Sequence, residues 1–197
     1  MLDLTPATKV LADLVAAVRD DQLTAPTPCT ESNVADLLDH IDGLSLAFAA
    51  AARKTPLEGT PSADGSRLGP DWRPRIARRL ADLADAWRDP GAWTGMTRAG
   101  GIDLPGEVAG AVVADELTVH GWDLAVASAQ PYDADPGLVD LALEFVTPTV
   151  ARNPDGTPGL FGPPVAVTDS AHALDRLLGL TGRDPAWTAA SVAAATE

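Results

Sequence analysis

Apolar residues recur at intervals of three and four over four long stretches of this chain, and a proline follows each stretch. Such spacing places the apolar side chains on one face of a helix. The predicted long helices cover residues 6–21, 33–54, 74–89 and 105–129. Shorter helices are predicted at residues 136–150 and 171–180. Because each apolar face has to be buried against another element, four long helices predict a four-helix bundle.

Local signals place the ends of the first two helices and the connections between the others. We expect Thr5 to cap the first helix, because a proline suited to a first helical turn follows it. Asn33 is expected to cap the second helix, with Asp36 three residues later completing a weak capping box. Residues 55–71 are rich in Pro, Gly and Ser and predict a long crossover loop. Residues 93–104 are predicted to be an irregular connection.

The composition supports an all-α fold. Alanine and leucine dominate, and only 5% of the residues are aromatic, which favours helices over sheet. A length of 197 residues suits one domain with a small appendage. We therefore predict a helical bundle over residues 1–150 and a short helical extension over residues 151–197, packed on the bundle.

The charge balance argues against nucleic acid and anionic membranes as partners. Lys and Arg total 14 and Asp and Glu total 28, so the formal net charge is −14. A chain this acidic repels phosphate groups. Its arginine cluster is interpreted as the solvated side of a helix and comprises Arg73, Arg75, Arg78 and Arg79.

Targeting signals are not seen in the sequence. The N-terminus lacks a basic segment followed by an apolar core, and no apolar run reaches the roughly 18–20 residues that span a bilayer. A single cysteine, Cys29, excludes an internal disulfide. We expect a cytoplasmic protein.

One motif indicates a metal site. Glu116 and His120 stand four residues apart on the fourth predicted helix, so their side chains lie on the same helical face. A second of the three histidines, His40, lies on the amphipathic second helix. Two histidines and one glutamate with an open fourth position are typical of a catalytic zinc site. The motif therefore predicts metal binding by these three residues.

Each of these ligands also has a simpler interpretation. Glu116 and His120 could form an ion pair on the helix surface, and His40 could pair in the same way with Asp36. Asp123 could accept a hydrogen bond from a ligand imidazole, or it could bind a backbone group or an arginine.

Three further residues near the motif have competing roles. Trp122 is either a core residue or part of a pocket wall. If the segment between them were helical, Cys29 would lie roughly 16 Å from His40, so we expect a buried structural thiol. His172 is expected on the surface or as a local helix cap.

Several stretches together resemble a known family. The resemblance rests on TPC at residues 27–29, VADLLDHI at residues 34–41, and Glu116 with HGWDLA at residues 120–125. These stretches resemble the metal-binding domain of mycothiol-dependent maleylpyruvate isomerases, within the DinB/YfiT-like superfamily. FGPPV, DRLL and GRDP at residues 161–165, 175–178 and 182–185 resemble the short actinobacterial subfamily.

The resemblance implies a DinB-like bundle that binds one divalent metal, often zinc and sometimes nickel, through His40, Glu116 and His120. It further implies mycothiol as a thiol cosubstrate in a transferase or cis–trans isomerase that acts on a small electrophile. Substrate-binding candidates are Trp122, Arg176 and Arg183, although each arginine could instead form a surface ion pair. No residue is assigned as general acid or base.

Two other functions stay open. One is a metal-binding DinB-like protein without turnover, in a stress or regulatory role. The other is a metal-free bundle that acts through oligomerisation, and homodimer formation is considered for either.

Overall fold

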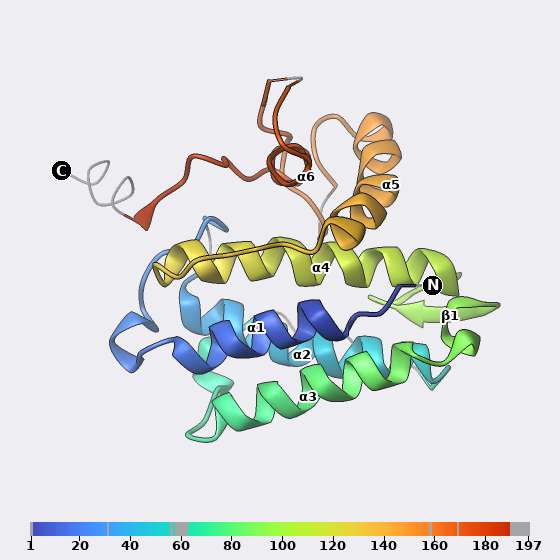
Figure 1. Cartoon of the computed structure of the whole chain (residues 1–197), viewed down its shortest axis with the longest axis horizontal. Coiled ribbons are helices and arrows are strands. Elements are labelled where there is room, and N and C mark those ends of the chain that lie inside the picture. Colours follow the sequence, from blue (N-terminus) through green and yellow to red (C-terminus); the bar gives the residue numbers. More distant parts are fainter. Residues whose placement is uncertain are drawn as a thin grey trace.

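The computed structural model of the chain describes residues 2–30, 32–55, 57, 63–157, 159–168 and 170–189. Its α-helices are α1 (Thr5–Ala17), α2 (Val34–Ala52), α3 (Trp72–Trp87), α4 (Gly106–Ala127), α5 (Pro136–Arg152) and α6 (Ala173–Leu180). The short 3-10 helices are η1 (Asp20–Gln22), η2 (Gly65–Arg67) and η3 (Pro90–Trp93). Helices α1 to α4 lie alongside one another, and α5 and α6 lie on the outer side of α4 (Figure 1). The predicted all-α four-helix bundle with a helical extension is confirmed.

The chain order of the bundle requires a long return connection. Helices α1 and α2 each pack against both α3 and α4. Helices α1 and α4 run in one direction, and α2 and α3 run in the other (Figure 1). Accordingly, the backbone N–H of Gly65 donates to the Asp36 carboxylate at the start of α2, although α2 ends at Ala52. The predicted crossover at residues 55–71 is therefore present, although residues 56 and 58–62 lie outside the described part.

Helix α4 is covered on two sides. The main core fills the bundle, and a second apolar cluster lies between α4, α5 and α6. The second cluster includes Val119, Trp122, Val139, Ala142, Leu177 and Leu178. Because both sides of α4 are buried, a polar side chain on this helix needs a partner inside the protein.

The second helix begins as predicted, but the first does not. The Asn33 side chain accepts a hydrogen bond from the Asp36 N–H, and the Asp36 carboxylate accepts one from the Asn33 N–H. In contrast, Thr5 is already the first residue of α1, and its N–H donates to the carboxylate of Asp3. The prediction that α1 reaches residue 21 was also wrong, because Val18 is extended and a separate 3-10 turn follows.

A small hairpin replaces part of the predicted irregular connection. Strand β1 (Met96–Ala99) pairs in antiparallel register with β2 (Ile102–Pro105). The turn consists of Gly100 and Gly101, whose φ angles are 58° and 81°. Two adjacent glycines with positive φ suit a two-residue hairpin turn. The irregular-connection prediction was therefore wrong at these residues.

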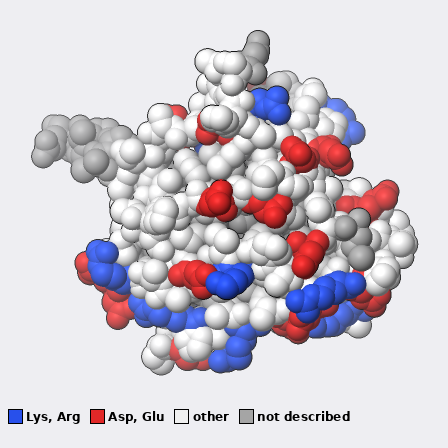
Figure 2. Space-filling view, viewed as in Figure 1, with Lys and Arg blue, Asp and Glu red and all other residues white. Residues whose placement is uncertain are grey.

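Three of the four α3 arginines are paired with carboxylates, whereas Arg78 is exposed as predicted. Arg75 and Arg79 both contact the Asp42 carboxylate, at 2.8 and 2.9 Å, and Arg73 contacts Asp20 at 2.7 Å. Figure 2 shows blue Lys and Arg atoms along the edge of the molecule where α3 lies, interleaved with red Asp and Glu atoms. In an acidic chain, these cations neutralise carboxylates, including the buried Asp42.

Within the described residues, no helix combines the length and apolar character needed to cross a bilayer.

Candidate metal centre

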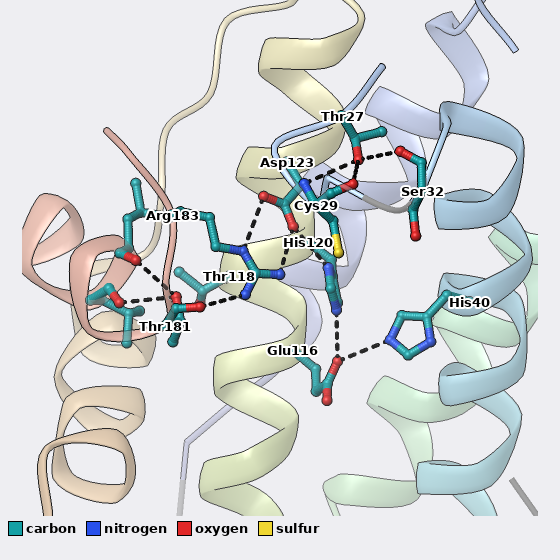
Figure 3. Close-up of polar contacts among 12 residues, drawn as sticks. Thr27, Cys29, Ser32, His40, Glu116, Thr118, His120, Asp123, Thr181 and Arg183 are labelled. Carbon is teal, nitrogen blue, oxygen red and sulfur yellow. Dashed lines mark hydrogen bonds and ion pairs between the residues drawn. The ribbon is translucent and has the colours of Figure 1, made fainter. Parts of the chain in front are cut away.

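The three predicted ligands converge. His40 lies on α2, and Glu116 and His120 lie on α4, which packs against α2. Oε2 of Glu116 lies 3.4 Å from Nε2 of His40 and 3.0 Å from Nε2 of His120 (Figure 3). One nitrogen or carboxylate oxygen from each residue lies within 4.8 Å of the other two. The geometry thus brings together residues that are 76 positions apart in the sequence.

Helix packing explains this convergence. Glu116 and His120 share one face of α4 because they are four residues apart. The rings of His40 and His120 meet edge to face, with centroids 4.7 Å apart and planes at 81°. The side chains of His120 and Glu116 are 13% and 18% exposed, whereas that of His40 is 38% exposed. The group therefore lies at the edge of the bundle, and solvent reaches it on the His40 side.

Asp123 fixes the orientation of His120. Its carboxylate has no exposed surface, and Oδ2 lies 3.0 Å from Nδ1 of His120. The same carboxylate binds the guanidinium of Arg183, with Nη2 3.1 Å from Oδ2. Both alternatives left open by the sequence, an imidazole partner and an arginine partner, are thus present together. With Nδ1 directed at Asp123, Nε2 of His120 faces Glu116 and His40.

The carboxylates around His120 change its protonation. Burial disfavours charge on the His120 imidazole, but hydrogen bonds and charges from Asp123 and Glu116 outweigh it and raise its pKa to about 10. Burial likewise favours protonation of Glu116, but hydrogen bonds from His120 and His40 hold its pKa well below the usual range. Without a metal, His120 is therefore an imidazolium between two carboxylates.

The donor set fits a divalent cation. Two imidazole nitrogens and one carboxylate oxygen suit zinc and nickel. The hydrogen bond from Nδ1 of His120 to Asp123 is the outer contact that a metal-binding histidine usually makes. Within the described ranges, these three residues form the single group of His, Cys, Asp and Glu side chains close enough to share an ion. A metal site at these residues remains our prediction, and the arrangement suits it.

Sequence reasoning missed Asp115. This residue precedes Glu116 on α4 and is 4% exposed. Burial, followed by the charge of Glu116, raises the pKa of Asp115 to about 8. Among the described residues, none forms a hydrogen bond with its Oδ1. The available signal was an acidic residue in a helix that is apolar on nearly all sides.

The other candidates occupy separate places. Trp122 packs in the second apolar cluster at 7% exposure, so its indole is a core side chain. Arg176 is exposed on α6, whereas Arg183 is buried against Asp123. His172 is exposed at the start of α6, and its side chain makes no capping hydrogen bond. The two arginines therefore have different environments, and Arg183 alone contacts the residues of the candidate site.

Cys29 differs from its predicted setting. The Thr27 hydroxyl accepts a hydrogen bond from the Cys29 N–H and donates one to the Ser32 carbonyl. Figure 3 shows Cys29 near His120 and Asp123. The thiol is half-buried rather than buried. The predicted distance between Cys29 and His40 assumed that the whole segment between them is helical, but α2 begins only at Val34.

Comparisons with known proteins agree with the helical architecture. The sequence model of the Mycothiol maleylpyruvate isomerase N-terminal domain family matches residues 4–125. Two uncharacterized proteins from two strains of Mycobacterium tuberculosis are each 30% identical to the chain over 132 residues, which cover 67% of it and 69% of each relative.

Two solved structures share the fold. The crystal structure of the mycothiol-dependent maleylpyruvate isomerase has a TM-score of 0.57 at 19% identity, and a histidine-to-alanine mutant of that enzyme has a TM-score of 0.57 at 18% identity. Each covers 74% of this chain, which in turn spans 65% of the solved chain. At this level of identity the likeness concerns the fold.

Proposed function

Because the chain belongs to the family of the Mycothiol maleylpyruvate isomerase N-terminal domain, we propose that it is a divalent-metal-dependent enzyme of thiol chemistry. It transfers a thiol to a small electrophile or isomerises that electrophile. Mycothiol, the thiol in the family name, is the proposed cosubstrate. The observation that carries the proposal is the convergence of His40, Glu116 and His120, with Asp123 behind His120.

The three ligands are suited to thiol activation. His40, Glu116 and His120 would hold a divalent cation, which would lower the pKa of a bound thiol and so supply a thiolate near neutral pH. Zinc is the expected metal and nickel the alternative. Two neutral imidazoles and one carboxylate leave such a cation with one net positive charge, which favours an anionic partner.

Two reactions are consistent with this chemistry. In a transfer, the sulfur bonds to an electrophilic carbon and the thiol proton leaves with the displaced group. In an isomerisation, the sulfur adds to one carbon of an activated double bond and the remaining single bond rotates. Cleavage of the C–S bond then restores the double bond and the free thiol. The first reaction consumes the thiol and the second regenerates it.

The residues around the ligands have supporting roles. Asp123 accepts a hydrogen bond from the Nδ1–H of His120 and so leaves Nε2 available for the metal. The low pKa of Glu116 keeps its carboxylate ionised at neutral pH. The half-exposed His40 borders the side from which a small molecule can enter.

The first test is the metal content of the untagged protein, purified without chelator and measured by elemental mass spectrometry. We expect about one zinc or nickel ion per chain in the wild type and a large loss in His120→Ala. The matched control is His172→Ala, because His172 is exposed at α6 and is not one of the proposed ligands. A metal-free wild type, even after incubation with zinc, contradicts the proposal.

The second test separates enzyme from binding protein. The metal-loaded protein is incubated with a panel of activated alkenes and alkyl halides, with and without mycothiol. Consumption that requires both mycothiol and His120 supports the enzyme. Full metal content without turnover of the whole panel instead favours a metal-binding protein in a stress or regulatory role.

A further inference from the structure

Arg183 follows α6 and reaches back to α4. The helix ends in a Schellman turn, in which the Arg183 N–H donates to the Leu178 carbonyl at 2.8 Å and the Gly182 N–H donates to the Gly179 carbonyl at 3.1 Å. Gly182 has a φ of +85°, which glycine adopts easily because it lacks a Cβ atom. The turn therefore fixes the point from which the Arg183 side chain starts.

The Arg183 guanidinium is held at both ends. Nη1 donates to the Thr181 carbonyl at 2.8 Å. On the other side, Nη2 and Nε donate to the two Asp123 oxygens at 3.1 and 3.4 Å (Figure 3). The side chain is only 10% exposed. A planar guanidinium held in this way fixes both the position and the plane of the carboxylate that it binds.

Asp123 depends on this contact. A carboxylate with no exposed surface is unfavourable unless positive charge and hydrogen bonds compensate it. Its other partner is His120, and a histidine that binds a metal is neutral. Once His120 binds an ion, Arg183 is the partner that still supplies a full positive charge to Asp123.

We propose that Arg183 is a positioning residue of the metal centre. It holds the Asp123 carboxylate in place, and Asp123 in turn presents Nε2 of His120 to the ion. This inference rests on the proposed function. Because Arg183 lies beyond residues 4–125, which the family model matches, the segment after α6 completes a site whose ligands come from the bundle.

The test compares zinc dissociation constants, measured by competition with a chromophoric chelator. We expect Arg183→Gln to weaken zinc binding by up to about 10- to 100-fold, the usual effect of removing the outer contact of a metal-binding histidine, which here is Asp123. Arg183→Lys keeps the charge but loses the planar contact, so it should weaken zinc binding less than Arg183→Gln does. Arg176→Gln is the matched control, because Arg176 is exposed on α6, the helix that precedes Arg183, and the zinc affinity of this variant stays that of the wild type.

A double-mutant cycle separates positioning from general stability. If Arg183 acts through Asp123, then Arg183→Gln causes no further loss of zinc affinity once Asp123→Asn is present. In the zinc-loaded protein, the Nδ1 proton of His120 should also exchange faster with water in Arg183→Gln, as seen by NMR. Additive losses in the cycle overturn the inference.

The remaining outcomes are also decisive. If Arg183→Gln fails to fold by circular dichroism, Arg183→Lys and the double variant Asp123→Asn/Arg183→Gln replace it, because the double variant leaves no unpaired buried charge. Wild-type zinc affinity in the Arg183 variants overturns the inference and leaves the proposed function intact. A wild type that binds no zinc overturns both.

Discussion

Nδ1 of His120 lies 3.0 Å from Oδ2 of Asp123, a carboxylate that has no exposed surface. On the opposite side of the ring, Nε2 of His120 lies 3.0 Å from Glu116. The imidazole is thus held between two carboxylates, which together stabilise its protonated form. A metal ion that binds at Nε2 has to replace the proton on that nitrogen.

Zinc binding should therefore release a proton. Because the pKa of His120 is raised to about 10, this residue is protonated in the metal-free protein at pH 7.5. We expect about one proton from His120 for each zinc bound, measured by calorimetry in buffers of different ionisation enthalpy. Asp123→Asn removes one carboxylate partner and lowers the pKa of His120, so this variant should release less than one proton from His120 for each zinc bound. Zinc binding without proton release contradicts the protonated state of His120.

Asp115 should make the metal-free protein less stable as the pH rises. Burial raises the pKa of Asp115 from an ordinary value of 3.8 to about 8, so the folded state holds the proton over this range. The stability that this proton contributes is present at low pH and is lost as the pH rises through 8. Between pH 3.8 and 8, ionisation of this carboxyl should lower the free energy of unfolding of the wild type by up to about 1.4 kcal/mol per pH unit. Asp115→Asn should abolish this dependence on pH.

The measurement for Asp115 is urea unfolding at several pH values in the presence of a chelator. The matched control is Asp140→Asn, because Asp140 is an exposed carboxyl on α5. An unchanged pH dependence in Asp115→Asn would show that this carboxyl does not hold its proton in the folded state.

The α2 cap should contribute measurably to stability. Asn33 and Asp36 each accept a hydrogen bond from the other's N–H. Asn33→Ala removes the side-chain acceptor and should lower the free energy of unfolding by about 1 kcal/mol. Asn33→Ser keeps a capping oxygen and should lie close to the wild type in urea unfolding. If both variants lost the same free energy of unfolding, the loss would not come from the capping hydrogen bond.

Periodicity indicated the helices apart from the two ends of α1, and spacing pointed to the three residues that the structure brings together. The pair Glu116 and His120 follows from the i and i+4 rule within α4, so it required no knowledge of the fold. His40 was found because its helix is amphipathic and histidines are few. These signals are local, and local signals can be read from a sequence.

Contacts between distant segments could not be predicted in this way. Arg183 and Asp123 are 60 residues apart, and their contact depends on how α6 and its final turn pack on α4. The position of Cys29 depends on the Thr27 hydroxyl, which accepts a hydrogen bond from the Cys29 N–H and donates one to the Ser32 carbonyl. The β hairpin was missed for a different reason, because strands of four residues carry little pattern and only Gly100 and Gly101 signalled the turn.

Gly121 should be required by the packing of Tyr132 beside the candidate site. A Cβ atom at residue 121 would lie 2.8 Å from the Tyr132 hydroxyl oxygen and 2.9 Å from its ring. That hydroxyl donates to the Thr118 carbonyl at 2.8 Å, so the ring cannot move away without losing a hydrogen bond. Gly121→Ala should therefore lower the free energy of unfolding by about 1–3 kcal/mol, as overpacking does elsewhere.

Gly43 provides the matched control for Gly121. It lies inside α2, and a Cβ atom there would meet no described atom within 4 Å apart from its chain neighbours and the adjacent backbone of its own helix. Gly43→Ala should raise the free energy of unfolding by up to about 1 kcal/mol, because alanine favours the helix over the unfolded chain. Urea unfolding of both variants gives opposite signs if the Tyr132 contact is as close as the structure places it. A gain in stability for Gly121→Ala as well would mean that Tyr132 does not pack against α4 at this position.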